Sequence, residues 1–147
     1  MSEQPDTAEH WRWWALAEQD LAHADSTLRS ESPVYRWVCV ASQQAAEKAL
    51  KAVLIKEQTA FPRIHDLDRL VLLLPTESKL RTLSVDLASL TAWSIAGRYP
   101  ADATDATRTD AENALRDARV VLNVAGEALG DAMESEVSVA DEAQPHN

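Results

Sequence analysis

Arg98 and Tyr99 are the leading candidates for contacting a ligand, because they stand together before Pro100, where a helix is expected to end. An arginine offers a planar fork of donors to a phosphate group, and a tyrosine ring can stack on a base. The pair therefore predicts a nucleotide or RNA contact. The alternative is structural: Arg98 could bond the last carbonyls of the helix, with Tyr99 packed on its rim.

A second polar group lies between residues 43 and 51. It comprises Gln43, Gln44, Glu47, Lys48 and Lys51. Glu47 and Lys51 are four residues apart with the acid first, which is the favourable order for an ion pair on a helix. The group is either a solvated helix face or a polar patch beside the arginine and tyrosine. In the second case, Lys48 and Lys51 are further candidates for binding nucleotide or RNA.

Apart from His65, which is considered below, the histidines and the single cysteine form no recognisable metal or catalytic motif. His10, His23 and His146 are predicted to be surface residues, and Cys39 to be a small core residue rather than a nucleophile. No HExxH, Walker or GxGxxG pattern is present. We therefore expect neither a metal site nor a cofactor.

The composition limits the class of protein. The chain has 147 residues, which suits a single domain, and only three glycines and six prolines, which argues against a turn-rich β-sandwich. Its net charge of −10 predicts poor non-specific binding to nucleic acid, although a local RNA site is compatible with that charge. The lone cysteine, the polar first ten residues and the lack of an 18-residue apolar run predict a cytoplasmic protein with no membrane segment.

Helical periodicity positions the candidate residues. The first helix is expected to begin near Asp6, with Glu9 completing an approximate capping box. The second is expected to begin at Ser32 and Pro33 and to continue without glycine or proline. A stripe of small residues predicts that this second helix is central, because small side chains let helices approach closely. The stripe is formed by Ala41, Ala45, Ala49 and Ala52.

The middle of the chain predicts one short and one long helix. Pro62 breaks the helical pattern, and a short helix carrying Leu67 and Leu70 ends at Pro75. Leucines at heptad spacing then predict a long helix that ends near Gly97. These leucines are Leu80, Leu83, Leu87 and Leu90.

The last helix is expected to begin with a capping box at Thr109 and Glu112 and to stop at Gly130. Residues 130–147 contain five acidic residues and no Lys or Arg, and we expect them to form a disordered tail. The predicted fold class is therefore all-α. It is an up-and-down antiparallel bundle of four long helices plus one short helix, over residues 6–129.

The five tryptophans indicate an interface. Trp13 and Trp14 are about 100° apart around a helix, so the three tryptophans of the first helix cannot all face one core stripe. Tryptophan is enriched at binding hot spots. We therefore expect a homodimer or another protein interface.

Taken in order, several stretches of about residues 8–129 resemble the HEPN domain family. They are AEQDLAHADSTL, YRWVCVASQQAAEKALKAVLI, FPRIHDLDRLV, GRYP and DAENALRDARVVL. The strongest are ASQQAAEKALKAVL, then HDL from His65, then RYP. The resemblance implies an α-helical bundle that is usually dimeric. Many members of the family are encoded beside a small nucleotidyltransferase and form a toxin–antitoxin pair with it.

Many other family members are metal-independent ribonucleases, whose site is an arginine followed, after four to six residues, by a histidine. Arg98 matches this arginine, but the positions for the histidine hold Ala103, Thr104 and Asp105. The family's ribonuclease motif is therefore missing. His65 could substitute if the fold brought it near Arg98; its alternative role is to cap the short helix.

The leading hypothesis is a non-catalytic or weakly active HEPN subunit that pairs with a nucleotidyltransferase and binds nucleotide or RNA near Arg98 and Tyr99. One alternative is a degenerate-site ribonuclease toxin that uses Arg98 as its phosphate clamp. Another is a purely structural dimerisation module.

Overall fold

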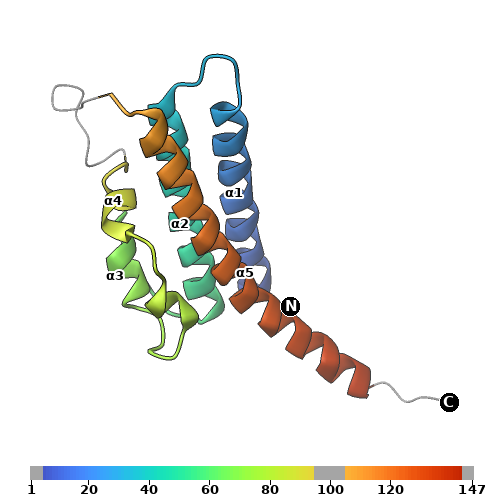
Figure 1. Cartoon of the computed structure of the whole chain (residues 1–147). Coiled ribbons are helices and arrows are strands. Elements are labelled where there is room, and N and C mark those ends of the chain that lie inside the picture. The colour runs from blue at the N-terminus through green and yellow to red at the C-terminus, as the bar shows by residue number, and fades with distance from the viewer. Residues whose placement is uncertain (1–4, 95–104, 144–147) are drawn as a thin grey trace.

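The computed structural model describes the backbone of residues 5–94 and 105–143, and the side chains of residues 9–94 and 105–130. Three long helices dominate these residues (Figure 1). They are α1 (Pro5–Leu28), α2 (Tyr35–Lys56) and α5 (Arg108–Ala143). The described residues between α2 and α5 form three short elements: α3 (Leu67–Val71), the 3-10 helix η1 (Lys79–Thr82) and α4 (Leu87–Thr91). No strand occurs in the described residues, and the predicted all-α class is confirmed.

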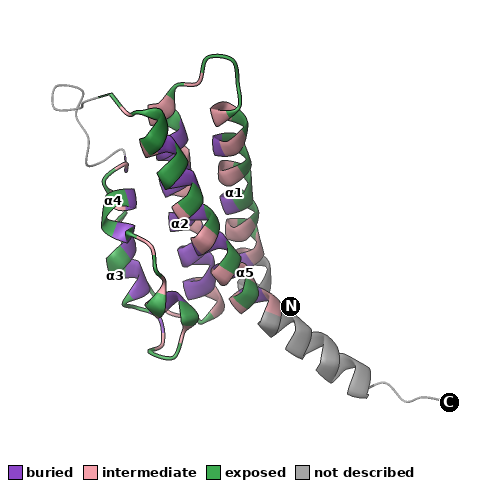
Figure 2. Cartoon of the chain, viewed as in Figure 1, coloured by how far each residue is buried: buried purple, intermediate pink, exposed green. Residues whose placement is uncertain are grey.

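Helix α2 is central, as the stripe of small residues predicted. It packs against α1, α5, α3 and α4. Figure 1 shows that α1 runs antiparallel to α2, whereas α5 runs in the same direction as α2. Residues 57–94 return along another side of α2, so they take the place of a fourth long helix. Ala45, Ala49 and Ala52 are fully buried, and Figure 2 shows how burial is concentrated along α2.

The predicted fourth long helix is not formed. Residues 79–91 instead make η1 and α4, with an extended backbone at Leu83 between them. The Ser78 side chain caps η1 and the Asp86 side chain caps α4, accepting hydrogen bonds from backbone amides at 3.2 and 3.0 Å. Serine and aspartate favour such caps over helix interiors, which breaks the long helix. The leucine spacing still predicted burial at three positions, Leu80, Leu87 and Leu90.

A capping box starts α5, but it is not at the predicted residues. The Asp110 amide donates to the Thr107 hydroxyl at 3.1 Å, and the Thr107 amide donates to the Asp110 carboxylate at 2.9 Å. The prediction of Thr109 and Glu112 was therefore wrong by two residues. Both pairs have the spacing of a capping box, and the path of the chain into α5 selects the first.

Two other helix limits differ from the prediction. Helix α2 begins at Tyr35, after Val34, rather than at residues 32–33, and the Val34 side chain makes no capping hydrogen bond. Helix α5 continues through Gly130 to Ala143. One glycine costs a helix only about 1 kcal/mol, so it does not force a stop. The division into a folded domain and an acidic, disordered tail stays a prediction.

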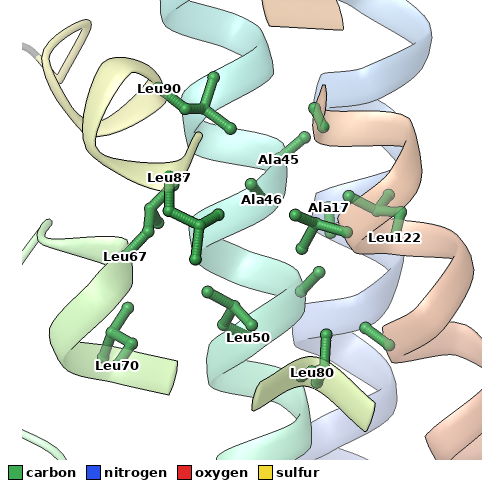
Figure 3. Packing of buried hydrophobic residues seen from close by; sticks show 14 of the residues in the cluster. Ala17, Ala45, Ala46, Leu50, Leu67, Leu70, Leu80, Leu87, Leu90 and Leu122 are labelled. Carbon is green, nitrogen blue, oxygen red and sulfur yellow. The ribbon is translucent and has the colours of Figure 1, made fainter. Parts of the chain in front are cut away.

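One hydrophobic core joins the short elements to the long helices. Figure 3 shows leucines of the short elements packed around the part of α2 that carries Leu50. They are Leu67, Leu70, Leu80, Leu87 and Leu90. The same cluster includes Ala17 of α1 and Leu122 of α5. This packing fixes the segment that follows α2, and with it the position of His65.

Candidate functional site

Four polar side chains form a connected cluster on α2 and in the loop that follows it. This Glu47 cluster consists of Gln43, Glu47, Lys51 and His65. The Glu47 carboxylate accepts from Gln43 Nε2 at 2.9 Å and from Lys51 Nζ at 2.8 Å. His65 Nδ1 lies 2.9 Å from Glu47 Oε1. Gln43, Glu47 and Lys51 face one side of α2 because they are four residues apart.

The cluster is buried at its centre and open at His65. Gln43 is fully buried, and Glu47 and Lys51 are 5% and 7% exposed, whereas the His65 side chain is 48% exposed. A second bond, 3.4 Å long, joins Gln43 Nε2 to the His65 carbonyl oxygen and ties the loop to α2. The arrangement therefore presents one half-exposed imidazole above a buried carboxylate.

The charge state of Glu47 decides which nitrogen of His65 carries the proton in the bond between them. Burial raises the pKa of Glu47. The hydrogen bonds from Lys51, Gln43 and His65 lower it, and together they outweigh the effect of burial, so that the pKa lies below its ordinary value. Glu47 is therefore ionised at neutral pH, and an ionised carboxylate only accepts hydrogen bonds. It follows that the proton between the two groups is on His65 Nδ1, so that Nε2 is the ring's acceptor in the tautomer that bonds to Glu47.

Lys51 is held by two aromatic rings as well as by Glu47. Its Nζ lies 5.9 Å from the ring centroid of Trp13 in α1 and 5.6 Å from that of Phe61 in the loop after α2. Such cation–π contacts stabilise a buried ammonium group. The Lys51 charge is thus already balanced inside the fold.

Lys48 points to a different neighbour. Its Nζ lies 2.6 Å from Asp20 Oδ2, which joins α2 to α1. Of the candidate binding residues, the structure therefore brings Lys51 and His65 together on opposite oxygens of Glu47, and it places Lys48 apart from them. Arg98 and Tyr99 lie outside the described residues.

The loop that carries His65 is anchored beside α4. The Leu67 amide donates to Thr91 Oγ1 at 3.0 Å, which joins the start of α3 to the end of α4. Asp66 caps α3 by accepting from the Arg69 amide at 3.2 Å. The cap of the short helix is therefore Asp66, whereas the His65 side chain turns to Glu47.

The bond between Glu47 and His65 was missed by the sequence reasoning. The spacing of Glu47 and Lys51 indicated an ion pair, but no local pattern connects residues 47 and 65, since they are joined only by the path of the loop. His10 was also misjudged: it is 2% exposed rather than at the surface, and its ring centroid lies 4.9 Å from that of Trp11.

Three further observations concern the described part of the chain. No group of three or more His, Cys, Asp or Glu side chains there is arranged to hold a metal ion. None of its helices combines the length and the apolar composition needed to cross a membrane. Cys39 is fully buried in α2 and belongs to the core, as predicted.

Comparison with known proteins gives a family match that includes the Glu47 cluster and a match to a solved structure. The model of the HEPN domain family matches residues 10–129. The crystal structure of TT1696 from Thermus thermophilus is similar to this chain, with a TM-score of 0.68 and 28% sequence identity. The similarity covers 81% of this chain and 97% of that one. No curated protein matches the sequence.

Proposed function

Because the chain belongs to the HEPN domain family, we propose that it is a HEPN subunit that pairs with a small nucleotidyltransferase and binds nucleotide or RNA. The pair would be of the toxin–antitoxin type. The chain would act in it as a homodimer, in the cytoplasm. The family membership supports this proposal, and the missing histidine after Arg98 favours a binding subunit over a ribonuclease of the family's usual kind.

The family match over residues 10–129 carries the proposal, and the state of the two candidate lysines limits where a ligand could bind. Lys48 pairs with Asp20 and Lys51 pairs with Glu47, so neither has a charge free for phosphate. The net charge of −10 adds a general repulsion of nucleic acid. Binding must then depend on a local contact, for which Arg98 and Tyr99 are the candidates, and on cationic surface supplied by a partner.

Affinity purification of the tagged full-length protein from its own cells, followed by mass spectrometry, tests the pairing. We expect a nucleotidyltransferase in stoichiometric amount. Light scattering of the purified chain is expected to give a dimer. Recovery of the chain without such a partner would contradict the pairing, and a clean monomer would contradict any site shared between two copies.

Binding of fluorescent single-stranded RNA and of labelled nucleotides by the purified complex tests the contact. Arg98→Ala is expected to weaken binding by about tenfold, a typical loss for one charged contact. Arg12→Ala removes the same charge from an exposed position of α1 and serves as the matched control. Equal affinity of the two variants would exclude Arg98 as a ligand contact.

A second function, a degenerate-site ribonuclease, is favoured by the bond between Glu47 and His65. A carboxylate that holds Nδ1 leaves Nε2 able to take a proton, as in other carboxylate–histidine pairs. Nε2 could accept the proton of a ribose 2′-hydroxyl, whose oxygen would then attack the adjacent phosphorus as a 2′,3′-cyclic phosphate forms. The bond from phosphorus to the 5′-oxygen breaks, and that oxygen takes a proton from water and leaves as a hydroxyl. Arg98 would hold the phosphate group.

RNA cleavage by the wild type and by His65→Ala separates the two functions. If the ribonuclease proposal holds, His65→Ala lowers the rate by at least about a hundredfold, as expected for a lost general base. His23→Ala, at an exposed position of α1, is expected to retain the wild-type rate. Equal rates for both variants would exclude His65 as the base. A wild type that does not cleave RNA would exclude the ribonuclease proposal and leave the binding subunit as the proposed function.

A further inference from the structure

A groove separate from the Glu47 cluster opens at the C-terminal end of α2. It lies between that end of α2, residues 74–80 and the part of α5 around residue 126, and has a volume of about 260 Å³. Figure 1 shows these three segments side by side at the end of the bundle away from residues 105–108. Ligand pockets usually measure roughly 300–1,000 Å³, so this groove suits inserted side chains better than a whole cofactor.

The groove has an apolar floor. Val53 and Leu80 are buried beneath it, and Val124 and Ala128 of α5 are half-buried along one side. Apolar surface of this kind gains free energy when a partner covers it. The floor alone does not identify the partner.

The charge around the groove identifies the kind of partner. Glu57, Glu77 and Glu127 are exposed at its edge, against the single cation Lys79. None of the three carboxylates forms an ion pair with a described residue. The C-terminal end of α2 adds the negative end of its helix dipole. The edge therefore favours positive charge.

We propose that this groove docks a basic, amphipathic segment of a partner protein. The segment places apolar side chains on the floor and lysine or arginine side chains beside the three glutamates. The chain's own residues 131–147 are a poor occupant, because their charged residues are all acidic. A second copy that presented the same edge is disfavoured, because the three glutamates would then face three more. This inference is independent of the proposed function, because it uses none of the same residues.

Fluorescence anisotropy with a labelled peptide tests the proposal on the full-length protein. The probe is an amphipathic peptide of leucine and lysine, about 14 residues long, or four helical turns. Glu77→Gln/Glu127→Gln is expected to weaken its binding about tenfold at low salt. The control Glu31→Gln/Asp105→Asn removes the same two charges from exposed positions at the other end of the bundle and is expected to change affinity less than about twofold.

Further arms separate docking in the groove from simple charge attraction. Ala128→Arg places a bulky cation over the floor and is expected to weaken binding at least as much as the double variant. A peptide with serine in place of leucine, or with glutamate in place of lysine, is expected not to bind.

Four outcomes would overturn the proposal. The first two are equal effects of the two double variants, and failure of the wild type to bind the leucine–lysine peptide. The third is binding of the serine peptide as tight as that of the leucine peptide. The fourth is self-association of the wild type that Ala128→Arg abolishes and the other variants do not. The last outcome would assign the groove to a second copy.

Discussion

Glu47 is the residue on which the buried polar contacts of α2 converge, so its removal should be costly. In Glu47→Gln, the Lys51 ammonium group stays buried without a charged partner. Leaving one member of a buried ion pair typically costs about 3–5 kcal/mol. We expect a loss near the lower end of that range in the free energy of unfolding, measured with urea, because glutamine still accepts a hydrogen bond.

The double variant Glu47→Gln/Lys51→Met is the control for that prediction. It removes the unpaired charge and is expected to recover part of the lost stability. If Glu47→Gln were as stable as the wild type, the cluster would not hold a buried ion pair in solution.

The same carboxylate predicts how stability depends on pH. The pKa of Glu47 is lowered in the folded protein from an ordinary value of 4.5, so the unfolded chain binds the proton more readily. The contribution of Glu47 to stability is therefore complete above pH 4.5 and is lost as the pH falls through the folded pKa. Between neutral pH and about pH 3.5, the wild type should lose more stability than Glu47→Gln. Parallel losses in the two proteins would contradict this.

Ser42 carries a buried hydroxyl that forms no hydrogen bond with a described residue. It is fully buried in α2, and its Oγ has no hydrogen-bond partner among the described residues. Burying an unsatisfied hydroxyl costs about 1–3 kcal/mol, so Ser42→Ala should raise the free energy of unfolding by about 1 kcal/mol. Ser89→Ala is the comparison, because its hydroxyl is exposed and donates to Asp86 at 2.6 Å. A loss of stability in Ser42→Ala would show that the hydroxyl has a partner in solution.

At the scale of the elements, the start of α5 gives a matched pair of variants. Thr107 accepts the capping hydrogen bond from Asp110, whereas Thr109, the residue that the sequence favoured, is exposed and makes no such bond. Thr107→Ala should lower the free energy of unfolding by about 1 kcal/mol, and Thr109→Ala should change it by less than about 0.5 kcal/mol. Urea unfolding measures both changes. A larger loss in Thr109→Ala than in Thr107→Ala would show that the helix is capped at Thr109, as the sequence predicted.

The segment of residues 79–91 shows what leucine spacing can and cannot predict. Its leucines were expected on one face of a long helix, and three of them are buried. The backbone between them is extended at Leu83, because Ser78 and Asp86 each start a short element. Hydrophobic spacing reports which side chains face a core, whereas local side-chain bonds decide whether the backbone stays helical.

At the scale of the whole molecule, the central position of α2 predicts where the fold resists opening. The interior of α2 packs against four other elements, so its amides can exchange only when much of the bundle opens. Residues 76–86 are mostly exposed or half-buried and hold short elements. Native-state hydrogen exchange should therefore be slowest in residues 45–54 and much faster in residues 76–86. Similar rates in both segments would contradict a core built around α2.

The sequence by itself determined the all-α class, the central second helix and most of the buried leucines, because these depend on periodicity and small side chains close together in the chain. It also pointed to Glu47 and Lys51 as an ion pair, since four residues make one helical turn. Only the tertiary structure decided that His65 bonds to Glu47, that His10 is buried and that three glutamates surround an apolar groove. Those contacts join segments distant in sequence, and their geometry depends on how loops and helices pack rather than on any local spacing.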